Sequence, residues 1–92
     1  MDSEALDHLS SRIQVFASFL LSSLTILSEA KMPLDHLEVY YYRDIEVEGW
    51  DYIVVLFRVC SDDYDRLLEV WSKLSRSVPK TLSDVHVEVQ PC

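Results

Sequence analysis

The chain has 92 residues, of which 49% are hydrophobic and only one is glycine. This composition is typical of one folded domain and not of a disordered segment. The formal net charge is −8 at pH 7. Because an acidic surface repels phosphate backbones and anionic lipids, we expect neither DNA nor a membrane among the partners. A single glycine also argues against a glycine-rich phosphate-binding loop.

The first predicted element is a helix over residues 4–31, preceded by Ser3 or Asp2 as the N-cap and stopped by Pro33. Its apolar side chains recur at steps of three and four and predict one buried stripe: Leu6, Leu9, Ile13, Phe16, Leu20, Leu24 and Leu27. A second apolar set, which includes Phe19 and Ile26, lies off that stripe. We therefore expect this helix to contact the sheet on one side and a second subunit on the other. Its charge-free part, residues 13–28, is short for a membrane span, which needs about 20 apolar residues.

Two strands are predicted next, over residues 37–43 and 52–59. Both are apolar or aromatic on both faces, as strands buried on two sides are. Val39 and Tyr41 point one way, whereas Tyr40 and Tyr42 point the other. The connection over residues 44–51 contains the only glycine, Gly49, and is expected to fold Trp50 back as a plug.

The second half of the chain predicts a helix and an edge strand. Asp62 is the expected N-cap of the helix, and Pro79 ends it. Residues 85–90 alternate cleanly between valines and polar residues, which suits the edge of a sheet. The connection through the helix predicts that the second and third strands are parallel. Either the second or the first strand occupies the middle of the sheet.

The predicted fold class is thus α+β: one domain over residues 1–92, with the order α-β-β-α-β and two helices mainly on one face of a three-stranded sheet. This order resembles a ferredoxin-like fold that lacks its first strand. The resemblance is one of element order alone and implies no activity.

No residue pattern predicts catalytic, cofactor-binding or metal-binding residues, so we expect a protein that is not an enzyme. His8, His36, His86, Cys60 and Cys92 lack the short paired spacing of a zinc site. The serines occur without a nucleophile-elbow motif. We expect both cysteines to be reduced, Cys60 to be a small core residue, and the protein to be cytoplasmic. The absence of asparagine favours a thermophilic source.

The predicted function is protein association, because one sheet face stays apolar after two helices cover the other. The sequence predicts a small acidic adaptor, regulator or inhibitor that forms a homodimer or higher oligomer and also suits a basic protein partner. The alternatives are a regulatory domain that senses a small molecule between subunits and an RNA-binding sheet. The predicted contact residues are Tyr40, Tyr42, Trp50, Tyr52, Val54 and Leu56, with Phe19 and Ile26 as a second patch.

Overall fold

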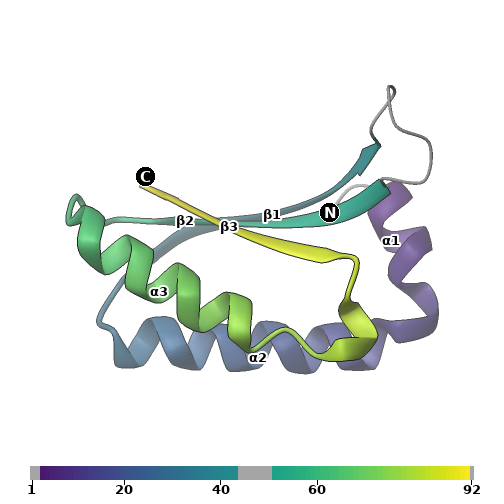
Figure 1. The fold of residues 1–92 in the computed structure, drawn as a ribbon, viewed down its shortest axis with the longest axis horizontal. Helices are drawn as coiled ribbons and strands as arrows, with labels where there is room; N and C mark the ends of the chain where they lie inside the picture. Colours follow the sequence, from purple (N-terminus) through teal and green to yellow (C-terminus); the bar gives the residue numbers. More distant parts are fainter. Residues whose placement is uncertain (1–2, 44–50, 92) are drawn as a thin grey trace.

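A computed structural model of the chain describes residues 3–43 and 51–91. Within them the sheet consists of β1 (Leu34–Arg43), β2 (Asp51–Val59) and β3 (Val85–Pro91). The helices are α1 (Ser3–Leu9), α2 (Ile13–Glu29) and α3 (Tyr64–Arg76), with short 3-10 turns η1 (Ser10–Arg12) and η2 (Lys80–Leu82). Helices α2 and α3 run beneath one face of the sheet, while α1 stands at its end (Figure 1). The predicted α+β class is confirmed.

The sheet has the order β1-β2-β3, with β1 antiparallel and β3 parallel to the central strand β2. This decides between the two predicted orders in favour of a central second strand. In the register, Tyr40 is opposite Val54, and Val54 is opposite His86. Tyr40, Tyr42, Tyr52, Val54 and Leu56 therefore share one face, as the alternation predicts.

Helix α3 begins one residue later than predicted. Its N-cap is Asp63, whose carboxylate accepts a hydrogen bond from the backbone N–H of Arg66 at 3.3 Å. This satisfies one of the free donors of the first turn. Along the exposed side, Lys73 and Glu69 form an i,i+4 ion pair at 3.4 Å.

The first helix is interrupted where the sequence predicts one continuous helix. Arg12 has φ −126° and ψ 19°, which are not helical values, and α2 starts at the next residue. The guanidinium of Arg12 donates to the backbone carbonyl oxygens of His8 at 2.9 Å and Thr81 at 3.0 Å. It also binds both carboxylate oxygens of Asp84, at 2.6 and 3.1 Å. One side chain thus ties the end of α1 to the segment that enters β3, and the chain turns at that point.

The ion pair shifts the pKa values of Arg12 and Asp84 in the directions expected for two bidentate partners. The hydrogen bond from Arg12 lowers the pKa of Asp84, and the same bond raises the pKa of Arg12. A carboxyl whose pKa is lower in the folded state stabilises the protein above its unfolded pKa, and this contribution is lost as pH falls through the folded value.

We therefore expect Asp84→Asn to lower the free energy of unfolding by about 1 kcal/mol at pH 7, since both partners retain solvent contact. The difference from the unsubstituted protein should shrink as pH falls below 3.8, the ordinary pKa of an aspartate. Urea denaturation of both proteins at pH 7 and near pH 3 measures this. An undiminished difference in acid would show that the ion pair is not its cause.

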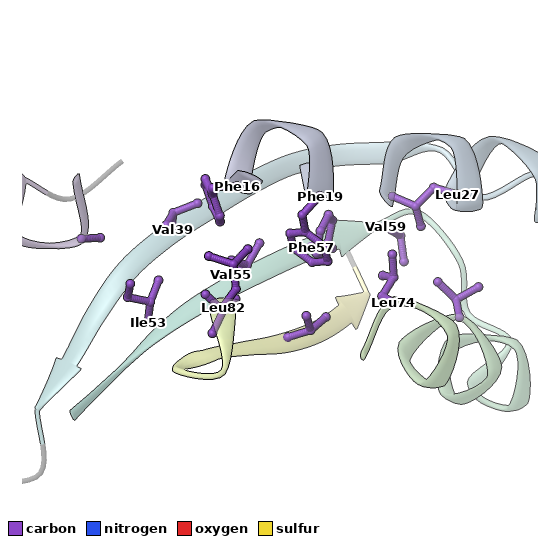
Figure 2. Packing of buried hydrophobic residues seen from close by; sticks show 14 of the residues in the cluster. Phe16, Phe19, Leu27, Val39, Ile53, Val55, Phe57, Val59, Leu74 and Leu82 are labelled. Atoms are coloured by element: carbon purple, nitrogen blue, oxygen red, sulfur yellow. The ribbon is translucent and has the colours of Figure 1, made fainter. Parts of the chain in front are cut away.

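The core lies between the sheet and α2 and α3 (Figure 2). From α2 it takes Phe16, Phe19, Ser23 and Leu27, and from the sheet Val39, Ile53, Val55, Phe57 and Val59. The predicted stripe is therefore correct at Leu9, Phe16 and Leu27 but wrong at Leu6, Ile13 and Leu24, which are exposed. A helix that is apolar around most of its circumference does not specify which side faces the sheet. Ser23 fits in the core because its hydroxyl donates to the Phe19 carbonyl oxygen at 2.8 Å.

By length and composition alone, the stretch Ser3–Glu29 is apolar enough to cross a membrane. In the structure this stretch is not one straight helix, because it turns at Arg12. Helix α2 by itself has 17 residues, which corresponds to a length of about 25 Å. A bilayer core is about 30 Å thick, so α2 is short for a span.

Candidate association surfaces

The face of the sheet opposite the helices is where the sequence predicts the main contact surface. No described element covers it (Figure 1). Its aromatic rings contact one another across all three strands. Tyr42 stacks on Tyr52 with ring centroids 4.8 Å apart, and Tyr52 lies against His86 at 4.3 Å. This face is therefore a layer of aromatic and charged side chains that already contact each other.

The aliphatic residues of this face lie beneath that layer. Val54 is 2% exposed and Leu56 is 4% exposed. Their prediction as contact residues is wrong, because the larger side chains on the flanking strands cover the short side chains of the central strand. Tyr40 and Tyr52 are half-buried, whereas Tyr42 is 44% exposed.

This face carries the carboxylates of Glu38 and Glu88 and the guanidinium of Arg58. Burial raises the pKa of Tyr40, and the neighbouring carboxylates of Glu88 and Glu38 raise it further. The two carboxylates beside Tyr40 would repel a phosphate backbone that approached that ring.

The second predicted patch does not form a surface. Phe19 is buried in the core, and Ile26 is partly buried and packs against it, so both predictions are corrected. Both residues lie on the side of α2 that faces the sheet. The sequence analysis placed them off the predicted buried stripe. Trp50, predicted as a plug, lies outside the described residues.

Helix α2 has an exposed apolar stripe, which the sequence analysis assigned in part to the core. We call it the α2 stripe; it consists of Ile13, Ala17, Leu21 and Leu24. These residues lie four, four and three positions apart, so they share one side of the helix. Leu21 is 67% exposed. On the polar side of the helix, Ser18, Ser22, Thr25 and Glu29 are exposed.

A third surface is a groove between α3 and β3, which we call the α3–β3 groove. Its volume is about 690 Å³, within the range of ligand-binding pockets. Apolar side chains form its α3 wall, and three of them, Tyr64, Leu68 and Trp71, are large and exposed. The wall from β3 consists of Glu88, Val89, Gln90 and Pro91. The sequence pattern does not reveal this groove, because the helical spacing of Tyr64, Leu68 and Trp71 is equally typical of core residues.

Cys60 differs from prediction in two ways. It is exposed, although the apolar strand that precedes it predicts a core residue. It is also disulfide-bonded, although we expected a reduced thiol. The sequence around Cys60 gives no local signal for a bond, because only the fold brings distant chain segments together.

Among residues 3–43 and 51–91, no group of three or more histidine, cysteine, aspartate or glutamate side chains is arranged to hold a metal ion. Comparisons with protein-family models, with curated proteins and with solved structures found no match. The function is therefore inferred from the surfaces described above.

Proposed function

We propose that this protein is a small acidic protein-association module that pairs with a second copy of itself through the α2 stripe. The observation that supports this proposal is the exposure of Ile13, Leu21 and Leu24 along one side of a single helix. Contiguous exposed apolar area is uncommon on monomeric proteins and marks contact sites. The open sheet face is a weaker candidate, because Val54 and Leu56 are already buried.

The charge distribution supports a second copy as the partner on this surface. Two chains of net charge −8 repel each other. Residues 13–28, however, contain no charged side chain. Pairing along α2 therefore joins the two copies over a surface without charged side chains, which limits the repulsion between them.

The pairing is expected to be two-fold symmetric, the commonest closed arrangement, in which the same patch contacts itself. The small side chain of Ala17 in the middle of the stripe allows the two helices to approach closely. Leu21 and Leu24 then pack as ridges into the grooves of the partner helix.

Leu21→Glu tests this proposal. A carboxylate placed at the centre of an apolar contact loses its hydration, so we expect the dimer dissociation constant to rise at least about tenfold, or 1.4 kcal/mol. Sedimentation equilibrium measures the constant, and circular dichroism shows that the fold is retained.

Ser18→Glu is the matched control, since Ser18 is exposed on the polar side of the same helix and gains the same charge. It should leave the constant within about threefold. Tyr42→Glu separates the α2 stripe from the open sheet face, because Tyr42 is the most exposed of the described contact residues predicted on that face. Equal weakening by Leu21→Glu and Ser18→Glu, or dissociation caused by Tyr42→Glu alone, would contradict the proposal.

The proposed location is the cytoplasm of a heat-adapted source. Disulfides are rare in the cytoplasm of mesophiles but common in intracellular proteins of hyperthermophiles. The disulfide at Cys60 and the absence of asparagine both fit that setting.

Cys60→Ser is then expected to lower the free energy of unfolding by about 2–4 kcal/mol. The thermal midpoint should fall by roughly 10 °C or more. Scanning calorimetry with and without a reductant measures both, and the reductant should affect only the unsubstituted protein. A midpoint of about 45–65 °C for the unsubstituted protein, which is ordinary for mesophiles, would argue against heat adaptation.

A further inference from the structure

The α3–β3 groove borders the free edge of the sheet. β3 pairs with β2 on one side, and among residues 3–43 and 51–91 no strand pairs with its other side. The indole N–H of Trp71 donates to the carbonyl oxygen of Val87 at 2.8 Å. That carbonyl therefore points away from β2, and alternation along a parallel strand directs the backbone groups of Val89 to the same free edge.

Trp71 and Pro91 limit this free edge at its two ends. The carbonyl oxygen of Val87 already accepts the hydrogen bond from Trp71, and Pro91 has no backbone N–H to donate. Val89 lies between them, and neither its N–H nor its carbonyl has a partner beyond the sheet among the described residues. A short extended peptide can form one pair of backbone hydrogen bonds there while its side chains enter the groove.

The residues that line the groove carry negative charge only. Asp62 and Glu88 are among them, and no lysine or arginine is. Arg58, which does not line the groove, is partly buried and donates to the Pro91 carbonyl oxygen at 3.5 Å. A second copy of this chain would bring further negative charge, whereas lysine or arginine side chains would neutralise the rim.

We infer that the α3–β3 groove binds an extended segment of a partner protein in which apolar residues alternate with lysine or arginine. The segment adds a short strand at Val89, its apolar side chains contact Leu67, Leu68 and Trp71, and its cations face Asp62 and Glu88. Main-chain pairing supplies part of the affinity, and the pockets for alternate side chains supply specificity. This inference does not depend on the α2 stripe.

Trp71 reports binding directly, because it lies in the groove. The chain has two tryptophans, so Trp50→Phe leaves Trp71 as the sole tryptophan in the full chain, and selective excitation of tryptophan avoids the tyrosines. The probe is a short synthetic peptide of alternating lysine and valine. We expect a saturable shift of Trp71 emission and a peptide of alternating glutamate and valine to bind at least about tenfold more weakly.

Two comparisons separate strand addition from a simple ionic contact. N-methylation of alternate amides on the lysine–valine peptide removes its edge donors, and we expect about tenfold weaker binding. Leu68→Ser should weaken binding severalfold, whereas the matched Leu21→Ser on α2 should not change it.

The inference is overturned if emission does not saturate up to about 1 mM peptide. Equal binding of the N-methylated peptide, or equal effects of Leu68→Ser and Leu21→Ser, would overturn it too. Leu21→Glu, which tests the α2 stripe, should leave peptide binding unchanged. Failure of one proposal is thereby distinguishable from failure of the other.

Discussion

Leu56→Glu is expected to unfold the protein or to lower its free energy of unfolding by about 4 kcal/mol or more. Leu56 lies on β2 and is 4% exposed, although no helix covers that face of the sheet. A carboxylate there loses its hydration beneath the flanking side chains, and the apolar contacts of leucine are lost as well. Urea denaturation followed by circular dichroism measures the change.

Tyr42→Glu is the matched control, because it introduces the same charge on the same face at a residue that is 44% exposed. Its effect should stay below about 1 kcal/mol. Equal stabilities of the Leu56→Glu and Tyr42→Glu variants would show that Leu56 is accessible to solvent. The open sheet face would then be a stronger candidate contact surface than the α2 stripe.

Phe57→Ala is expected to lower the free energy of unfolding by about 3–5 kcal/mol. Phe57 is fully buried on the central strand and points into the core beneath the sheet (Figure 2). The truncation removes apolar contacts and leaves a cavity that the surrounding sheet and helices fill only in part. For a domain whose total stability is about 5–14 kcal/mol, such a loss brings the protein close to unfolding.

Phe57→Leu provides the comparison, since it keeps most of the volume and should cost clearly less than Phe57→Ala. Thermal and urea denaturation should rank the three proteins in the same order. Similar stabilities for Phe57→Ala and the unsubstituted protein would mean that this position is not the centre of the core.

The strands could be predicted from the sequence more reliably than the first helix. In β2 and β3 the alternation of side chains fixes which residues share a face, and the order of elements predicts the parallel pair. In residues 4–31 apolar side chains occur around most of the circumference, so the pattern permits more than one orientation. The turn at Arg12 depends on Asp84, which is distant in the sequence and becomes a neighbour only in the fold.

The candidate surfaces were predictable only in part. The shared face of Tyr40, Tyr42 and Tyr52 follows from the two-residue period of a strand. That Val54 and Leu56 are covered follows from side chains on the neighbouring strands, whose register is a tertiary property. Trp71 fits the apolar side of α3 in sequence, yet its indole reaches the edge of β3 and borders a groove.

The solution mass of the unsubstituted protein tests the proposed self-association most directly. The chain has a mass of 10.7 kDa. Light scattering across micromolar concentrations should give twice that value, about 21 kDa, because the α2 stripe is then covered by a second copy. A mass that stays at one chain throughout this range would contradict pairing through α2.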